Sequence, residues 1–341
     1  MKSTKKILVI RNDKIGDFML AWPSFALLKR QYPEAEITAL VPRYTAPLAE
    51  QCEWIDKVLI DNKQTSFIKD ILNLSKLIRI NNYDVSISLF SEFRTAISLW
   101  LAQVSIRIGP ATKLAQVFLN KRVRQKRSRS VKPEYEYNLD LIEYYIKSNG
   151  EIPIARPQPP FLTFDKLEIT SLKNQFISTF SVPGNSKLIF IHPGTGGSAI
   201  NLSIEQYAKL VTDIAERNNV YIVITAGPGE QAIAEELSAQ LRDVKHHIHY
   251  SNTGLIDFCK FIGICDIFIS GSTGPLHIAG ALDICTVAFY PSKRSATPLR
   301  WQTLNCTQHR LAFTTENEHS DGSYQIDLNS AYTLIAEKYL G

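Results

Sequence analysis

The chain has 341 residues, of which 45% are hydrophobic and 21% are charged, and its formal net charge is +5. This composition is typical of a folded globular protein, and the length exceeds what one hydrophobic core usually serves, so two domains are expected. No apolar run approaches the roughly 18 residues that span a bilayer. The basic segment Met1–Lys6 leads into a strand rather than a signal-peptide core, which predicts a cytoplasmic protein.

In the first half of the chain, apolar strands alternate with amphipathic segments. The segment Phe18–Arg30 has helical spacing, with Leu20, Phe25 and Leu28 available for one apolar face. The apolar runs are nearly continuous, which is typical of strands that are covered on both faces of a parallel sheet. Strands are predicted at Lys6–Arg11, Glu36–Val41, Lys57–Ile60, Asp84–Phe90 and Val104–Ile108.

Four prolines between Glu151 and Phe161 interrupt this alternation and predict a linker. Beyond the linker the alternation resumes. Strands are predicted at Lys187–Ile191, Val220–Thr225, His247–Tyr250, Cys265–Ser270 and Cys285–Tyr290. Helices are predicted at Ile204–Glu216, Glu230–Leu241, Leu255–Ile264 and Pro275–Leu282.

Two successive alternations predict an α/β protein with two doubly wound domains that face a central cleft. The first domain is expected over residues 1–150, the linker over 151–161 and the second domain over 162–326. By fold analogy, a helix over 327–341 is expected to pack back on the N-terminal domain.

The loop after the first predicted strand, Arg11–Asp17, places a carboxylate at the start of the first helix. Asp17 is either a helix N-cap or a base that accepts a proton at the edge of the cleft. The residues alone leave both possibilities open. The loop contains one useful glycine and no GxGxxG pattern, which disfavours a nicotinamide oxidoreductase.

Three loops that follow strands of the second domain are predicted to share one nucleotide. They are His192–Ser198, Ala226–Glu230 and Ser270–His277. The third is a strand-to-helix turn in which Pro275 can open the helix, so backbone N–H groups and the positive end of the helix point at one anion. Glu230 is expected either to bind ribose hydroxyls or to interact with the N-terminus of its own helix.

Cations and cysteines set limits on partners and metals. The run Lys121–Arg129 holds six cations in nine residues, which is typical of a solvated loop or of a site for an anionic substrate or membrane. No aromatic residues are interleaved, so nucleic acid is not expected. The five cysteines form no CxxC pair, which disfavours a zinc site. The sequence also offers no acidic cluster to hold a metal, so no metal is expected.

The order and spacing of these motifs resemble glycosyltransferase family 9, which contains the bacterial lipopolysaccharide heptosyltransferases. The resemblance extends from about Lys6 to about Trp301. It implies a GT-B fold, an inverting transfer of heptose from ADP-heptose to the inner core of lipopolysaccharide, and Asp17 as general base. The motifs are Ile15–Asp17, Trp22–Pro23, Tyr32–Pro33, Arg107–Gly109, His192–Gly194, Gly227–Glu230 and Ser272–His277.

Under this hypothesis, the donor is a nucleotide sugar, no further cofactor is required, and the acceptor is an anionic lipid at the cytoplasmic face of the inner membrane. The donor-binding residues are then His192, Gly194, Thr195, Gly196, Gly227, Glu230, Ser272, Thr273, Gly274, Pro275 and His277. The acceptor-binding residues are Lys14, Arg94, Lys113, Arg122 and Arg124.

Two positions depart from the family pattern. Ser272 stands where the family often has an aspartate, and the segment Ile200–Leu202 lacks a lysine that the family places near the donor phosphates. Lys293 or Arg294 is expected to replace that cation. Three alternatives stay open: a relative that uses another nucleotide sugar, a nucleotide-sugar epimerase, and a non-catalytic nucleotide-sugar binder of the same fold.

Overall fold

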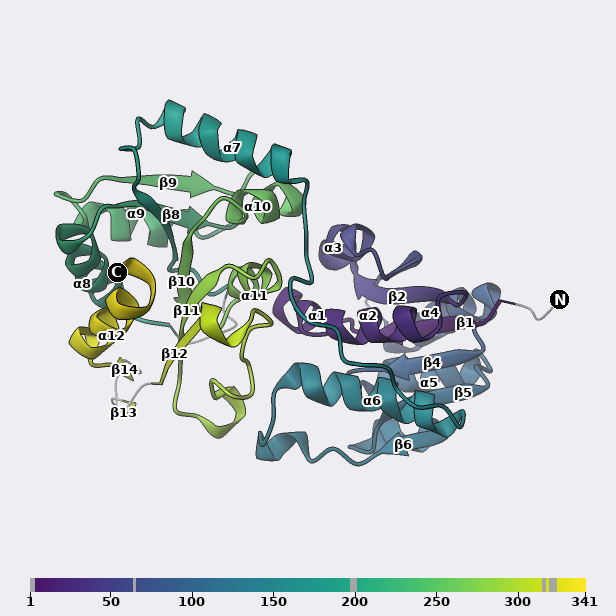
Figure 1. The fold of residues 1–341 in the computed structure, drawn as a ribbon. Coiled ribbons are helices and arrows are strands. Elements are labelled where there is room, and N and C mark those ends of the chain that lie inside the picture. Colours follow the sequence, from purple (N-terminus) through teal and green to yellow (C-terminus); the bar gives the residue numbers. More distant parts are fainter. Residues whose placement is uncertain (1–3, 64–65, 197–200, 315–316, 319–323) are drawn as a thin grey trace. The chain divides into compact units, whose positions relative to one another are not determined.

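The computed structural model describes residues 4–63, 66–196, 201–314, 317–318 and 324–341 (Figure 1). The chain divides into two compact units, Met1–Gln158 and Pro159–Gly341, so the boundary lies inside the proline-rich segment. Each unit contains a six-stranded sheet in which every neighbouring pair of strands is parallel. This confirms the prediction of two doubly wound α/β units.

The sheet of the N-terminal unit has the order β3-β2-β1-β4-β5-β6. Its strands are β1 (Lys6–Ile10), β2 (Glu36–Pro42), β3 (Lys57–Asp61), β4 (Val85–Ser88), β5 (Ile106–Pro110) and β6 (Lys121–Val123). Its helices are α1 (Ile15–Met19), α2 (Trp22–Gln31), η1 (Arg43–Thr45), α3 (Ala46–Gln51), α4 (Phe67–Asn81), α5 (Phe93–Leu101), η2 (Leu114–Phe118), η3 (Arg127–Arg129) and α6 (Glu134–Ser148).

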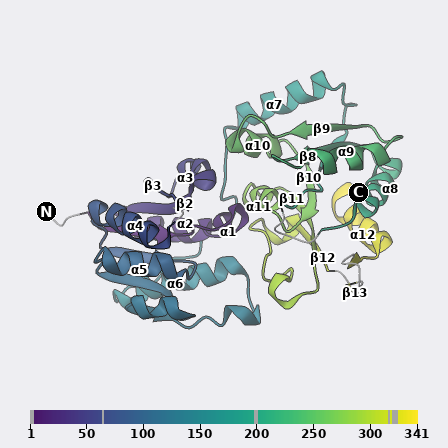
Figure 2. The ribbon, with the colours of Figure 1, turned by 180° about the vertical axis from the view of Figure 1, so that it is seen from behind.

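Helices α4 and α5 lie side by side over one face of this sheet (Figure 2). Leu8 and Ile10 of β1 pack there against Ile78 of α4 and Leu99 of α5, all of them fully buried. Helices α2 and α6 pack against each other. The strand residues are apolar on both faces because helices cover both sides.

The single helix predicted over 18–30 is two helices, α1 and α2. Pro23 lies in the first turn of α2. A proline has no N–H to donate and its ring collides with the carbonyl four residues earlier, which here belongs to Met19, the last residue of α1. The helix therefore ends at Met19 and restarts at Trp22.

The sheet of the C-terminal unit has the order β12-β11-β10-β7-β8-β9, and a two-stranded sheet pairs β13 with β14. The strands are β7 (Lys187–His192), β8 (Val220–Ala226), β9 (His246–Tyr250), β10 (Ile267–Gly271), β11 (Cys285–Tyr290), β12 (Arg310–Thr314), β13 (Asn317–Glu318) and β14 (Tyr324–Gln325). The helices are α7 (Lys166–Thr179), α8 (Ile204–Arg217), α9 (Gln231–Gln240), α10 (Leu255–Ile262), α11 (Gly274–Ala281), η4 (Arg294–Ala296), η5 (Thr307–His309), α12 (Leu328–Ile335) and η6 (Ala336–Leu340).

The C-terminal helix packs inside its own unit. Leu328, Ile335 and Tyr339 belong to the same buried cluster as Val211 and Ile214 of α8, against which α12 lies. Its apolar face is thus covered by the C-terminal unit. That the helix also packs back on the N-terminal domain stays a prediction. Among the described residues, no helix is long and apolar enough to cross a membrane.

Candidate active site

The loops after β1, β3 and β4 meet at the carboxyl edge of the N-terminal sheet. The Asn12 side chain donates to Asp61 Oδ2 at 2.7 Å and to Glu92 Oε2 at 2.9 Å. Asp61 ends β3, and Glu92 precedes α5. Because β1 lies between β2 and β4, these bonds hold the loop that carries Asp17 against its neighbours.

A buried guanidinium organises this loop. Arg11 is 1% exposed. Its Nε donates to Asp13 Oδ1 at 2.9 Å, and its Nη2 donates to Asp17 Oδ1 at 2.5 Å. Its Nη1 donates to Glu134 Oε1 at 2.9 Å and to Asn138 Oδ1 at 3.2 Å, so α6 completes the shell. Burial lowers the pKa of Arg11, but the three carboxylates outweigh it and raise that pKa above its usual value.

Asp13 is the acid of this cluster that titrates near neutrality. Burial, opposed by Arg11 and reinforced by Asp17, raises the pKa of Asp13 to about 7. Asp17 is partly exposed, lies in the first turn of α1 and shares the guanidinium with Asp13. No side chain caps α1, so the sequence alternative in which Asp17 is its N-cap does not describe this helix.

The structure separates the five cations expected to contact the acceptor. Arg94 is buried, and its guanidinium is bound by Asp61, Asp70 and Glu92. Arg94 therefore holds the interior of the N-terminal unit together instead of presenting a charge at its surface, which corrects the expectation. The other four are exposed, namely Lys14, Lys113, Arg122 and Arg124.

The three predicted nucleotide loops of the C-terminal unit lie at one edge of one sheet. Strand β7 pairs with β10 on one side and with β8 on the other. Their following loops therefore begin side by side, at the point where the strand order reverses. Residues 197–200, which include the end of the first loop and Ile200, lie outside the described residues.

Glu230 joins two of these loops. Its carboxylate accepts from Gly196 N at 3.0 Å and from Gly227 N at 2.9 Å, and its Oε2 lies 3.4 Å from His192 Nε2. A Cβ on Gly194 would collide with this carboxylate, so the close approach requires glycine. Burial lowers the pKa of His192 below its usual value, and the opposing effects of Glu230 and Thr225 only partly offset this.

Glu230 is the N-cap residue of α9 but makes no cap hydrogen bond with its side chain, which binds the two loops instead. Binding of ribose hydroxyls by Glu230 and binding of the donor by Gly196 stay predictions.

The turn from β10 to α11 leaves a helix N-terminus open toward the same edge. Ser270 Oγ donates to His192 O at 3.0 Å and lies 3.0 Å from Thr273 Oγ1, which ties the turn to β7. Pro275 lies in the first turn of α11, as predicted. The N-cap residue Thr273 makes no cap hydrogen bond with its side chain, so it leaves the first N–H groups of α11 available to a ligand.

His277 is buried one turn into α11. Burial lowers its pKa to about 4, so the ring is neutral at pH 7 and cannot meet a phosphate as a cation. Its Nδ1 has no hydrogen-bond partner among the residues that the structure describes. A neutral ring with a free nitrogen can still exchange a hydrogen bond with a bound ligand.

Comparison with known proteins decides the family. The model of glycosyltransferase family 9 (heptosyltransferase) matches residues 71–325. The chain belongs to glycosyltransferase family 9. This confirms the resemblance seen in the sequence motifs, and the protein is a glycosyltransferase.

Two relatives and one solved structure extend the comparison. A protein of Haemophilus influenzae, provisionally named a glycosyltransferase, is 43% identical over 91% of this chain and 89% of its own length. Lipooligosaccharide heptosyltransferase 2 of Haemophilus ducreyi is 26% identical over 86% of this chain and 85% of its own length. The structure of the E. coli ADP-heptose lipopolysaccharide heptosyltransferase II has a TM-score of 0.73 at 21% identity, and covers 97% of this chain and 99% of that chain. This likeness shows the GT-B fold and confirms the expected fold class.

The family 9 glycosyltransferase uses Asn201 at the place where the family pattern led us to expect a lysine. Asn201 Nδ2 donates to Pro193 O at 3.1 Å, and its Oδ1 accepts from Leu202 N and from the Tyr207 hydroxyl. A Cβ on Gly271 would lie 2.7 Å from Asn201 Oδ1. Asn201 therefore holds the loop after β7 in place and packs closely against the end of β10, a role that the sequence analysis missed.

Lys293 and Arg294, the expected replacements for that lysine, are exposed in the segment that follows β11. Strand β11 is the neighbour of β10, so both cations follow a strand at the same edge as the nucleotide loops. Their role in binding the donor stays a prediction.

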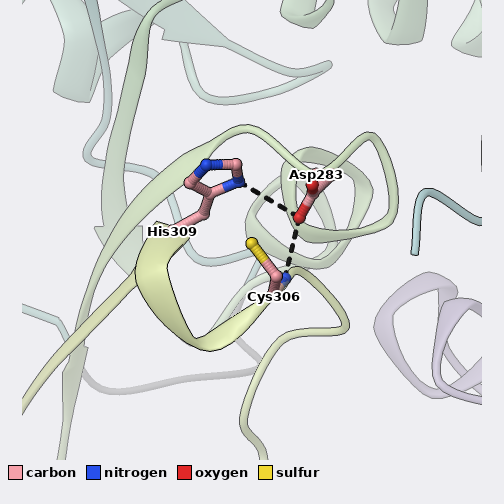
Figure 3. A group of neighbouring side chains, drawn as sticks. All are labelled: Asp283, Cys306 and His309. Atoms are coloured by element: carbon pink, nitrogen blue, oxygen red, sulfur yellow. Dashed lines mark hydrogen bonds and ion pairs between the residues drawn. The ribbon is translucent and has the colours of Figure 1, made fainter. Parts of the chain in front are cut away.

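Three side chains of the kinds that bind metal ions also lie close together in the C-terminal unit (Figure 3). Asp283, Cys306 and His309 have ligand atoms within 4.8 Å of one another, and His309 Nδ1 lies 3.2 Å from Asp283 Oδ1. Asp283 precedes β11, so the group lies at the amino edge of the sheet, away from the nucleotide loops. Spacings of 23 and 26 residues from Asp283 gave no sequence signal for it, and the expectation that no metal is needed stays a prediction.

Proposed function

We propose that this glycosyltransferase transfers a heptose from ADP-heptose to the inner core of lipopolysaccharide, with inversion at the anomeric carbon and with Asp17 as general base. The observation that carries the proposal is the placement of Asp17 at the carboxyl edge of the N-terminal sheet, partly exposed and oriented by Arg11. The family and the names of its relatives support the sugar and the acceptor. The E. coli structure is named for ADP-heptose, and the H. ducreyi relative for lipooligosaccharide.

In the proposed reaction, the acceptor hydroxyl oxygen forms a bond to the anomeric carbon while the bond from that carbon to the diphosphate oxygen breaks. The hydroxyl proton passes to a carboxylate oxygen of Asp17, and ADP leaves from the opposite face of the sugar. Arg11 keeps Asp17 in place through a charge-assisted hydrogen bond of 2.5 Å. General-base catalysis of this kind contributes about 10²–10⁴-fold in rate.

The C-terminal unit holds the donor in this proposal. The open N-terminus of α11, from Thr273 to Leu276, faces the diphosphate and stabilises the charge that develops on it. The neutral ring of His277 offers one further hydrogen bond. Glu230 is positioned to exchange its bond with a backbone N–H for bonds to the donor, because it joins two of the three nucleotide loops.

Exposed cations of the N-terminal unit serve the acceptor. Lipopolysaccharide cores carry phosphate groups, and Lys14, Lys113, Arg122 and Arg124 are exposed. Arg94 is not part of this set, because its charge is neutralised in the interior. No further cofactor or metal ion enters the proposed reaction, and the lipid-linked acceptor is met at the cytoplasmic face of the inner membrane.

Two measurements test the proposal. Calorimetric titration with ADP, UDP, GDP and NAD, without acceptor, is expected to show selective binding of ADP. Asp17→Asn is expected to bind ADP like the wild type and to lose about 10²–10⁴-fold in turnover. Asp257→Asn, which changes an exposed carboxylate on α10, is the control and is expected to keep full turnover.

Other outcomes replace the proposal with a defined alternative. Selective binding of UDP or GDP would keep the transferase and change the sugar. Turnover of the donor without any acceptor would indicate an epimerase. Binding of none of the nucleotides would indicate a protein that has lost the donor site, and full turnover by Asp17→Asn would remove Asp17 from the mechanism.

A further inference from the structure

An exposed apolar strip crosses the outer surface of α4, α5 and η2 in the N-terminal unit. It consists of Phe67, Ile68 and Leu72 on α4, Trp100 on α5, and Leu114 and Val117 on η2. Leu114 is 73% exposed, Ile68 69% and Val117 64%. Single exposed apolar residues need no explanation, but a contiguous group of this size marks an interaction site.

Ring contacts join the strip into one surface. The Phe67 ring stacks on that of Phe93 with centroids 6.4 Å apart, and the Phe93 ring meets the edge of Phe118 at 5.5 Å. The Trp100 ring lies 5.7 Å from the same Phe118. Helices α4 and α5 pack side by side (Figure 2). Helix α5 also packs on η2. The aromatic rings thus form a continuous layer between the aliphatic side chains of α4 and those of η2.

The charge around the strip is strongly positive. Between residues 63 and 133 the chain carries fourteen Lys and Arg but only three Asp and Glu. Three of these cations, Arg94, Arg127 and Lys132, pair with acids outside that range, namely Asp61, Glu134 and Asp140. Two of the three acids within the range are engaged by Arg94, namely Asp70 and Glu92. Exposed cations stand within the strip itself, with Lys69 and Lys76 on α4 and Lys113 directly before Leu114.

This combination identifies the chemistry of the partner. A second copy of the chain would bring two positive surfaces together, which electrostatic repulsion opposes. Nucleic acid would use the cations and rings but would leave Ile68, Leu72, Leu114 and Val117 without an apolar environment. An anionic bilayer satisfies both features, because aliphatic and aromatic side chains enter the boundary between headgroups and acyl chains while Lys and Arg bind lipid phosphates.

We propose that the face formed by α4, α5 and η2 is a membrane-docking surface that binds an anionic phospholipid bilayer. The apolar strip enters the bilayer interface, and the surrounding cations bind the headgroups. The inference rests on the proposed function in one respect, since a lipid-linked acceptor lies in such a bilayer. It assigns membrane contact to a defined apolar face of the N-terminal unit, and not to the basic run Lys121–Arg129 alone. That run follows η2 closely in the sequence.

The test is co-sedimentation of the purified full chain with vesicles, in the absence of donor and acceptor. The wild type is expected to bind vesicles of phosphatidylglycerol and phosphatidylethanolamine at about 0.1 M salt, to bind phosphatidylcholine vesicles at least about tenfold more weakly, and to lose binding as salt screens the cations. Leu114→Gln/Val117→Gln is expected to lower the partition coefficient about tenfold or more. Lys69→Gln/Lys76→Gln is expected to lower it about fivefold for each cation removed.

A matched control separates this face from exposed apolar residues in general. Leu167→Gln/Leu334→Gln changes two exposed leucines on α7 and α12 of the C-terminal unit and is expected to leave the partition coefficient unchanged. Thermal unfolding of each variant checks that the fold is kept. Because the changed residues are exposed, we expect unfolding temperatures close to that of the wild type.

The inference is overturned if the wild type leaves anionic vesicles unbound, binds phosphatidylcholine equally well, or keeps its affinity in the Leu114→Gln/Val117→Gln variant. It is equally overturned if that variant loses self-association instead of vesicle binding. ADP binding is titrated on the same samples. Vesicle binding without ADP binding would therefore contradict the proposed function but not the docking surface. ADP binding without vesicle binding would contradict the docking surface but not the proposed function.

Discussion

Replacing Arg11 with glutamine would remove the one guanidinium that binds Asp13, Asp17 and Glu134. Arg11 is 1% exposed, and the Glu134 side chain is 2% exposed, so water cannot replace the contact between these two residues. Glu134 would keep its bond to Arg127 at 2.7 Å. Asp13 and Asp17 would face each other without their shared cation.

The expected size of this effect follows from the burial. Removing one partner of a buried ion pair destabilises a protein by about 3–5 kcal/mol, since the other charge stays buried without compensation. For a unit of this size, 1 kcal/mol corresponds to about 2–4 °C in Tm, so Arg11→Gln is expected to lower the Tm by about 6–20 °C. Arg11→Lys keeps the charge but replaces the planar guanidinium and its five donors with an ammonium that has three, and is expected to lose less than Arg11→Gln.

Thermal unfolding at pH 5 and pH 8 is the assay. In the Arg11→Gln variant the crowded carboxylates can take up protons at low pH, so its loss of stability is expected to be smaller at pH 5 than at pH 8. Arg30→Gln, which removes an exposed cation from α2, is the matched control and is expected to stay within about 0.5 kcal/mol of the wild type. A loss for Arg11→Gln below about 1 kcal/mol, or an equal loss at both pH values, would refute the reasoning.

Three further changes probe the same two units. Asp13→Asn removes an acid whose pKa is raised to about 7. Because the folded state favours the protonated form of Asp13, this group stabilises the fold fully below about pH 4, and the stabilisation is lost as the pH rises through 7. The Tm of the Asp13→Asn variant is therefore expected to rise relative to that of the wild type between pH 5 and pH 8. Parallel curves of Tm against pH for the two proteins would contradict this. Glu230→Gln is expected to lower the pKa of His192 further in an NMR titration, because the lost carboxylate raises it; a higher pKa would exclude that pairing. Gly280→Ala places a Cβ 2.6 Å from Thr303 Cβ and is expected to cost about 1–3 kcal/mol in denaturant unfolding, whereas Gly184→Ala, with nothing within 4 Å, is expected to cost little.

The apolar strands were predictable because a strand buried on both faces is apolar at most of its positions. Strands β1, β7, β8 and β11 were predicted to within one residue of their bounds. Strands β6 and β12 were not predicted, although the other two edge strands, β3 and β9, were. An edge strand has only one neighbour to bond and can stay polar and partly exposed, as the residues of β6 are, so its sequence resembles a loop.

The loops that follow strands were also predictable, since parallel strands bring their carboxyl ends to one edge. The sequence alone therefore assigned Asp17 to one edge, and assigned the loops carrying Glu230 and His277 to another. The partners of those residues were not predictable. Glu134 binds Arg11 although the two residues are 123 positions apart in the sequence. Arg94 is predicted from the sequence to be a surface cation, whereas in the fold Asp61 of β3 and Asp70 of α4 surround it.

The sequence by itself thus determined the two doubly wound sheets, the family and the loops that carry the chemistry, because apolar period and motif order are local properties of the chain. Only the tertiary structure decided which charges are buried and which stay in water. The same residue type, arginine, is an interior clamp at Arg11 and Arg94 and a surface cation at Arg122 and Arg124. The difference arises because burying a charge requires opposite charges from distant segments to converge on it, and that convergence exists only in the folded chain.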